Sequence, residues 1–203
     1  MDKPAFTRLE ALALPLDRRN VDTDQIIPAR FLRKPRAAGM AAYLFHDLRF
    51  DAEGRARPDF VFNDPAFAGA GIVVARENFG SGSSREAAVY ALWDGGIRSV
   101  IAPSFGDIFY SNALKNGLLP VVLPADRVEI FLSALSAQPG LRMQIDLGTQ
   151  TVALAGVATE RFEICPFQKH LLMTGQDELG YTLALDEKVR AFETARAQSQ
   201  PWL

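Results

Sequence analysis

The feature that most constrains the fold of this chain is a regular alternation of strand and helix patterns in its middle third. Apolar runs typical of buried strands occupy residues 71–75, 100–102 and 118–123. Helical patterns lie between them, and they end at Gly95 and at Gly117. Strands separated by helices pair in parallel, because each helix carries the chain back over the sheet. The sequence therefore predicts an α/β fold with a parallel strand-helix-strand core.

Two further elements are predicted on either side of this alternation. A first strand covers residues 6–16 and ends near Pro15. A helix begins at Asp126, with Glu129 placed for a capping box. Its apolar positions follow helical spacing: Val128, Phe131, Leu132 and Leu135.

The C-terminal third changes pattern twice. Residues 143–164 alternate between apolar and polar as strands do, with a turn at Gly148 and a partner strand over residues 161–164. Residues 166–203 form a C-terminal helical segment, which is predicted to break at Gly175 and at Gly180. Since no internal repeat or low-complexity linker is visible, a single domain over residues 1–203 is predicted.

Residues 33–70 show little periodicity apart from a short helix predicted around residues 40–45. Several cations lie here among glycines and prolines: Arg33, Lys34, Arg36, Arg49, Arg55 and Arg57. Loops of this length in a compact domain are usually functional or mobile. Two interpretations remain open, a solvated insertion and a long mobile lid that brings a cation to an acidic ligand.

The loop of residues 77–86, Glu-Asn-Phe-Gly-Ser-Gly-Ser-Ser-Arg-Glu, joins the first strand of the alternation to its first helix. Gly80 and Gly82 allow backbone N–H groups to approach a ligand closely. Serine hydroxyls and the guanidinium of Arg85 share the same small volume, where a helix N-terminus already favours negative charge. An anionic ligand is therefore predicted at this loop.

Three other interpretations of the loop compete with this one. Ser83 and Glu86 match a capping box, which leaves the glycines and Arg85 unexplained. A dinucleotide fingerprint is disfavoured, because Arg85 stands where a third glycine would permit close helix–strand packing. A serine hydrolase is disfavoured, because the loop is not Gly-x-Ser-x-Gly and His170, on an apolar helix face, is more typical of a core residue.

A second polar stretch, residues 20–28, is rich in Asn, Asp and Thr. Their short side-chain oxygens satisfy nearby backbone N–H groups, so a turn or helix cap is the simpler interpretation. Two carboxylates, Asp22 and Asp24, flank Thr23, which is also a common way to line a site.

Composition narrows the classes of function. A net charge of -2 without any basic run argues against nucleic acid or an anionic membrane as the main partner. No signal-peptide pattern or apolar stretch of bilayer length is visible, so a cytoplasmic location is predicted. The only cysteine, Cys165, and the distant His46 and His170 offer no metal-ligand spacing. A cysteine-ligated iron–sulfur cluster cannot be built from this chain alone, so any such metal is expected from a partner.

Several separated motifs in this chain resemble one known family. They are the loop of residues 77–86, Val-Ile-Ala-Pro-Ser-Phe at 100–105, Asn-Ala-Leu-Lys-Asn-Gly-Leu-Leu-Pro at 112–120, Val-Asp-Thr-Asp-Gln-Ile-Ile-Pro-Ala-Arg-Phe-Leu at 21–32, and Pro-Asp-Phe-Val-Phe-Asn at 58–63. Together they resemble the swivelling domain of the aconitase superfamily, and most closely the small subunits of bacterial 3-isopropylmalate dehydratases. The resemblance covers residues 21–183 and keeps the motifs in order.

The resemblance implies a fold, a reaction and a partner. The fold would be a swivelling β/β/α barrel-like domain with a long flexible loop. The reaction would be the isomerisation of 2-isopropylmalate and 3-isopropylmalate, small dicarboxylates, through isopropylmaleate in leucine biosynthesis. A separate large subunit, in a heterodimer or heterotetramer, would carry a four-iron four-sulfur cluster, and this chain would bind no cofactor or metal itself.

The resemblance also implies a catalytic residue. Ser83 matches the serine whose alkoxide acts as the base. A serine hydroxyl is a poor base in water, so its anion needs stabilisation, which the N–H groups of the loop around Gly80 and Gly82 would supply.

Other matched positions are implied to bind substrate. Ser84 and Arg85 match the residues that hold a substrate carboxylate, a task that suits a planar guanidinium. Thr23 and Asp24 match the family's threonine–aspartate pair near the site. Arg36, in the long loop, is the predicted second arginine.

The chain departs from the family at three positions, and two alternatives stay open. Ala87, Ser81 and Leu48 stand where the family usually has histidine, cysteine and tryptophan. A missing histidine beside the loop would alter loop geometry or partner contacts, although the motif with Ser83 and Arg85 is intact. The alternatives are a related dehydratase acting on methylmalate, citraconate or homoaconitate, and a non-catalytic swivelling domain that binds an anion or a partner.

Overall fold

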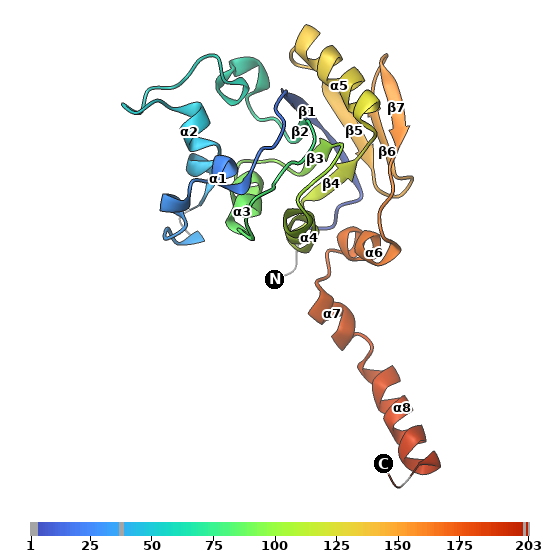
Figure 1. Cartoon of the computed structure of the whole chain (residues 1–203). Coiled ribbons are helices and arrows are strands. Elements are labelled where there is room, and N and C mark those ends of the chain that lie inside the picture. Colours follow the sequence, from blue (N-terminus) through green and yellow to red (C-terminus); the bar gives the residue numbers. More distant parts are fainter. Residues whose placement is uncertain (1–3, 37–38, 201, 203) are drawn as a thin grey trace.

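A curled seven-stranded sheet forms the centre of the molecule (Figure 1). The structure, a computed structural model, describes residues 4–36, 39–200 and 202. The strand order is β4-β3-β2-β1-β5-β6-β7. The strands are β1 (Arg8–Leu16), β2 (Ile72–Ala75), β3 (Ser99–Ala102), β4 (Leu119–Val122), β5 (Arg142–Asp146), β6 (Thr151–Leu154) and β7 (Ala158–Arg161). The α/β fold predicted from the alternation is confirmed.

Strand β1 joins a parallel half of the sheet to an antiparallel half. Its last four residues pair in parallel with β2, and its first five pair antiparallel with β5. The strand continues one residue past Pro15, which lies opposite Val74. Proline is tolerated there because the pairing with β5 ends at Leu12, so no second neighbour needs its missing N–H.

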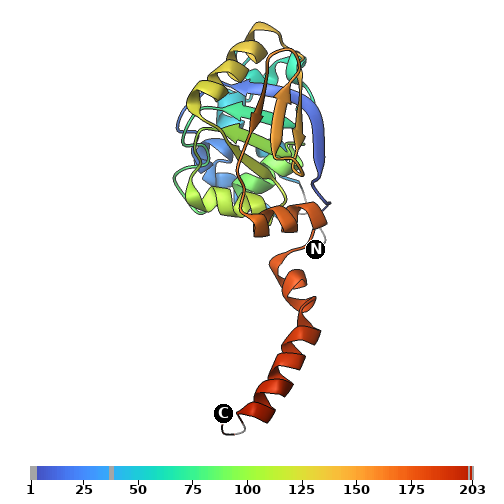
Figure 2. The same ribbon diagram turned by 90° about the vertical axis from the view of Figure 1, so that its right-hand side faces the viewer.

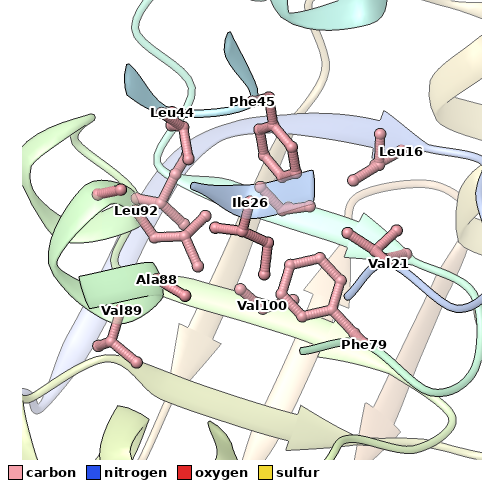
Figure 3. Packing of buried hydrophobic residues seen from close by; sticks show 14 of the residues in the cluster. Leu16, Val21, Ile26, Leu44, Phe45, Phe79, Ala88, Val89, Leu92 and Val100 are labelled. Carbon is pink, nitrogen blue, oxygen red and sulfur yellow. The ribbon is translucent and has the colours of Figure 1, made fainter. Parts of the chain in front are cut away.

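The parallel half carries the predicted crossover helices. They are α3 (Ala87–Asp94), α4 (Asp107–Lys115) and α5 (Ala125–Ala137). The apolar stripe of α5 is buried in a cluster on one face of the sheet, together with Ile72 and Ile101. Helix α3 packs into a second cluster, part of which Figure 3 shows, and this cluster contains Val73 and Val100. Because successive strand residues point to opposite faces, these two side chains lie on the face opposite that of Ile72 and Ile101. Both faces of the parallel half are therefore covered.

Two predictions for residues 126–164 are wrong. The partner strand expected over residues 161–164 lies earlier, as β7, and a further strand, β6, precedes it. The capping box expected at Glu129 does not form: α5 begins at Ala125 after Pro124, and Glu129 pairs with Arg76 instead. Short elements of four residues give too little periodicity to locate from sequence.

Residues 33–70 contain single turns of helix that pack against the sheet. With the preceding stretch they form α1 (Thr23–Ile26), η1 (Ala29–Phe31), η3 (Ala41–Tyr43), α2 (His46–Arg49), η4 (Val61–Asn63) and η5 (Pro65–Phe67). The helix predicted around residues 40–45 is one 3-10 turn, η3. Leu44 and Phe45 enter the core beside Ile26 and Leu92 (Figure 3). Residues 37–38 of the predicted loop lie outside the described residues, and its mobility stays a prediction.

The C-terminal segment leaves the body as an arm. Helix α6 (Pro166–Thr174) packs on the sheet and ends at Gly175, as predicted. Helices α7 (Glu178–Leu183) and α8 (Asp186–Ser199), hereafter the C-terminal arm, extend away from the body (Figures 1 and 2). The break predicted at Gly180 is wrong, because its N–H donates to Asp177 Oδ1 and so belongs to the cap of α7.

Candidate active site

The loop of residues 77–86 is held between two other segments of the chain. On one side, Phe79 N donates to Ser104 O at 3.0 Å, and Gly106 N donates to Phe79 O at 2.9 Å. On the other side, Gly80 N donates to Val21 O at 2.6 Å. Thr23 N in turn donates to Ser81 O at 2.9 Å. The loop therefore runs past the ends of β2 and β3 in a fixed path beside α1.

Gly80 is required by packing as well as by backbone conformation. Its φ is +73°, and a Cβ at this position would lie 2.2 Å from Cγ of Phe109 in α4. Gly82 has φ +98° and is exposed. A Cβ at this position would lie nearest to Asp22 Cβ and Thr23 Oγ1. The N–H of Gly80 already donates to Val21 O, and the sequence did not indicate this structural role. The predicted anion cradle at Gly80 and Gly82 stays a prediction.

The structure brings Ser83 against Thr23, sixty positions away in the sequence. Their hydroxyl oxygens are 2.7 Å apart, and Ser83 N also donates to Thr23 Oγ1 at 3.3 Å. Thr23 is 2% exposed, and Asp22 caps α1 by accepting from Gln25 N at 2.8 Å. The turn and cap predicted for residues 20–28 are thus confirmed, and the cap fixes the threonine that contacts Ser83.

Arg85 is paired with Asp24. Its Nη1 donates to Asp24 Oδ1, which also accepts from Ala29 N at 2.9 Å. The side chain of Arg85 is only 24% exposed, whereas that of Asp24 is 59% exposed. A guanidinium has five N–H donors, so this pair leaves Arg85 further donors for a ligand. Thr23, Asp24, Ser83 and Arg85 therefore form one cluster at the loop, and Ser84 beside them is exposed.

Arg36 lies against α3 rather than in this cluster. Its guanidinium carbon is 3.7 Å from the centroid of the Tyr90 ring. Burial raises the pKa of Tyr90, and Glu86 raises it further, while the positive Arg36 acts in the opposite direction. Glu86 Oε1 also accepts from Asn116 Nδ2 at 2.7 Å. Tyr90 gave no signal in the sequence, and Asn116 stood out only as part of the motif at residues 112–120, because the contacts of both side chains join distant residues.

The capping-box interpretation of Ser83 and Glu86 is wrong. Helix α3 begins at Ala87, and Glu86 is its N-cap residue without a side-chain cap hydrogen bond. Ser83 is instead paired with Thr23. Arg85 consequently precedes the helix and does not lie in its first turn.

The histidines and the cysteine lie outside the cluster. His46 contacts Asp47, and Asp47 holds a pKa of about 2 chiefly through its hydrogen bond from Arg30. His170 is exposed and contacts Tyr181, so its predicted core position is wrong. Cys165 is exposed.

No membrane-crossing helix and no metal site are found in the described part of the chain. Within residues 4–36, 39–200 and 202, no group of three or more His, Cys, Asp and Glu side chains is arranged to hold a metal ion. Among the same residues, no helix has the length and apolar character needed to cross a membrane.

Comparisons with known proteins identify the family. The profile of the aconitase C-terminal domain matches residues 3–126, and that of the C-terminal domain of 3-isopropylmalate dehydratase small subunits matches residues 180–203. The 3-isopropylmalate dehydratase small subunit of Phenylobacterium zucineum is 50% identical over 200 residues, covering 98% of both chains. That of Roseobacter denitrificans is 45% identical over 203 residues and covers all of both chains.

This chain belongs to the 3-isopropylmalate dehydratase small-subunit family.

A solved structure within the family agrees with the fold. The crystal structure of a 3-isopropylmalate dehydratase from Methanocaldococcus jannaschii has a TM-score of 0.64 and 28% identity, and the match covers 92% of this chain and 99% of that one. The predicted resemblance and fold class are thereby confirmed.

The three departures from the family pattern have different surroundings. Ala87 and Leu48 are partly buried against the core, and Ser81 supplies the carbonyl that Thr23 N binds.

Proposed function

We propose that this chain is the small subunit of a hydro-lyase that isomerises 2-isopropylmalate and 3-isopropylmalate through isopropylmaleate in leucine biosynthesis. The observation that carries the proposal is the pairing of Ser83 with Thr23 directly beside the Arg85–Asp24 pair. It combines a hydroxyl suited to proton transfer with a cation suited to a carboxylate. The full-length relatives bearing this enzyme's name support the choice of reaction.

Ser83 would act as the base. Dehydration requires removal of a C–H proton and departure of hydroxide from the neighbouring carbon. Ser83 Oγ, as an alkoxide, would take the proton; in the rehydration hydroxide would add to the carbon that lost the proton, and Ser83 would return the proton to the carbon that lost the hydroxyl. An alkoxide oxygen can only accept hydrogen bonds, so in that state the Thr23 hydroxyl 2.7 Å away must be the donor. Thr23 Oγ1 accepts from Ser83 N at the same time, which orients its own proton towards Ser83 Oγ.

The charged pair would bind and orient the substrate. Arg85 would hold one carboxylate of the dicarboxylate, with Ser84 beside it, because a guanidinium binds a carboxylate through two parallel hydrogen bonds. Asp24 carries the same charge as the substrate, so its contribution would be to fix the guanidinium of Arg85 rather than to touch the carboxylate. Arg36 would meet the second carboxylate.

A large subunit is the proposed partner. Among the described residues, no group of three or more His, Cys, Asp and Glu side chains could hold a metal ion. The single cysteine, Cys165, cannot ligate a cluster alone. A four-iron four-sulfur cluster, if it serves this reaction, would therefore belong to the large subunit in a heterodimer or heterotetramer. The expected location is the cytoplasm, where such biosynthesis uses soluble substrates.

The decisive experiment reconstitutes the enzyme. The chain is mixed anaerobically with a cluster-bearing large subunit, and isopropylmaleate absorbance is followed. Ser83→Ala should lower kcat about 1,000-fold, since the general base is lost. Ser133→Ala, on the exposed surface of α5, is the matched control and should leave kcat unchanged.

Three results would contradict the proposal. Full activity of Ser83→Ala would remove the catalytic role of this serine. No turnover of isopropylmalate by the wild-type pair, but turnover of methylmalate or homoaconitate, would favour a related dehydratase. Absence of turnover with every substrate would favour the non-catalytic swivelling domain.

A further inference from the structure

The position of Arg36 is set by contacts with α3. Arg36 comes from residues 33–70, yet its guanidinium carbon lies 3.7 Å from the centre of the Tyr90 ring. At this distance the positive charge is attracted to the face of the ring. Tyr90 is itself half-buried and packs against the apolar core around α3. The ring is thus a fixed platform under an otherwise flexible side chain.

A carboxylate, that of Glu86, and the guanidinium of Arg36 both act on the Tyr90 phenol. Burial and Glu86 raise the pKa of Tyr90, whereas the positive charge of Arg36 lowers it. Glu86 Oε1 accepts from Asn116 Nδ2 at 2.7 Å, and the same amide group donates to Asn112 O at 2.9 Å. The carboxylate is therefore tied to the C-terminal end of α4.

This arrangement brings the two candidate arginines to the start of one helix. Arg85 directly precedes Glu86, which is the N-cap of α3, and Tyr90 lies one helical turn later. Residues four apart lie on the same face of a helix, so Arg36 is held on the face that begins at Glu86. Arg85 therefore lies just before α3, and the stack on Tyr90 holds Arg36 against the first turn of the same helix.

We propose that Tyr90 is a positioning residue that holds Arg36 ready for the second carboxylate of the substrate. The proposal rests on the proposed function and names a residue that it does not use. An arginine has many rotamers, and ordering it only when substrate arrives would weaken binding. Stacking on Tyr90 orders the side chain beforehand, so the loss of the ring should affect substrate binding more than the chemical step.

Steady-state kinetics of the reconstituted enzyme test this role. Tyr90→Leu keeps an apolar side chain but removes the aromatic face, and it should raise KM roughly three- to tenfold with kcat within about twofold. Tyr90→Phe keeps the ring and should restore most of the wild-type KM. Tyr181→Leu, on the C-terminal arm, is the control and should leave KM unchanged.

A double-variant cycle separates positioning from general damage. If Tyr90 acts through Arg36, Arg36→Ala and the double variant Arg36→Ala/Tyr90→Leu should have the same KM. Additive increases in KM would overturn the proposal, and so would an unchanged KM in Tyr90→Leu.

A spectroscopic readout on the chain alone distinguishes failure of this proposal from failure of the proposed function. In NMR spectra at neutral pH, the ring current of Tyr90 should shift the side-chain protons of Arg36. The shift should persist in Tyr90→Phe and in Tyr181→Leu and disappear in Tyr90→Leu. Absence of the shift in the wild type would overturn the contact and the proposal with it. A shift of the expected kind in a chain that supports no turnover would overturn the proposed function, and the positioning role would fall with it.

Discussion

Residues 40–70 and the C-terminal arm both lie outside the sheet, but only residues 40–70 contribute to the core. In residues 40–70, five large side chains are at most 8% exposed: Met40, Leu44, Phe45, Phe60 and Phe67. In the C-terminal arm, four comparable side chains are between 46% and 66% exposed: Leu179, Leu183, Val189 and Phe192.

The comparison shows that regular secondary structure and burial in the core do not go together in these two regions. Residues 40–70 form only single turns, yet they fold over α1 and α3 and seal one face of the sheet. The arm consists of regular helices whose apolar side chains face solvent. Both regions contain large apolar side chains, so the presence of such residues does not determine which region is buried.

Truncating one phenylalanine in each region should give the largest contrast. Phe45→Ala removes a fully buried ring and should lower the free energy of unfolding by about 3–5 kcal/mol. Phe192→Ala removes a ring that is 64% exposed and should change it by less than about 0.5 kcal/mol. Urea unfolding of the isolated chain measures both. Equal losses would show that the arm is packed in solution.

Two glycines with nearly the same positive φ, Gly80 and Gly54, extend the contrast into the body. Gly80→Ala combines positive φ with a clash against Phe109, and should cost about 2–5 kcal/mol. Gly54→Ala has φ +76° with nothing within 4 Å of its Cβ, so only the conformational cost of about 1–2 kcal/mol should appear. The difference between their unfolding midpoints measures the packing contribution. A difference of zero would mean that α4 moves away freely.

Thr23→Val should distinguish a catalytic role of Thr23 from a purely structural one. The substitution keeps the shape of a 2%-exposed side chain and removes the hydroxyl next to Ser83. On the proposed function, kcat should fall about tenfold, because one hydrogen bond to the serine anion contributes roughly 1–2 kcal/mol. Thr194→Val in the arm is the matched control. If Thr23→Val lowered stability but not kcat, Thr23 would have no part in the chemistry.

The smallest expected effect is a pH dependence of the unfolding free energy, caused by Asp47 in residues 40–70. Arg30 holds the pKa of Asp47 at about 2, below its ordinary value. The pair should therefore stabilise the fold above a pH of about 4 and lose this contribution as the pH falls through about 2. Because both side chains are 53% exposed, solvent screening should limit the contribution to less than about 1 kcal/mol.

Asp47→Asn checks this assignment. The difference in unfolding free energy between wild type and variant should shrink steadily between about pH 5 and about pH 2. A difference that stays constant over this range would assign the effect to packing or hydrogen bonding instead of charge.

The sequence predicted those parts of the fold in which a regular pattern of apolar residues is repeated many times. The strand-helix alternation and the buried stripe of α5 are repeated often enough to be recognised. Strand β6 has four residues, and the helix break before α8 falls at Ala184 and Leu185 without a glycine, so neither had a usable signal.

The candidate site was predicted only in part, because its contacts join distant segments. Resemblance to a known family pointed to Thr23 and Ser83, whereas spacing along the chain could not bring them together. The partners of the candidate arginines were not foreseen: Asp24 for Arg85, and Tyr90 for Arg36. The need for Gly80 depends on the position of Phe109, which only the packing of α4 determines.

The place of β1 at the junction of the two half-sheets has a consequence for biosynthesis. Translation delivers this strand first, but its partners β2 and β5 follow much later, at residues 72–75 and 142–146. Until then its edges carry unpaired N–H and C=O groups, which are templates for pairing with other chains. The strand that joins the two halves of the finished sheet is thus the one exposed longest on the ribosome.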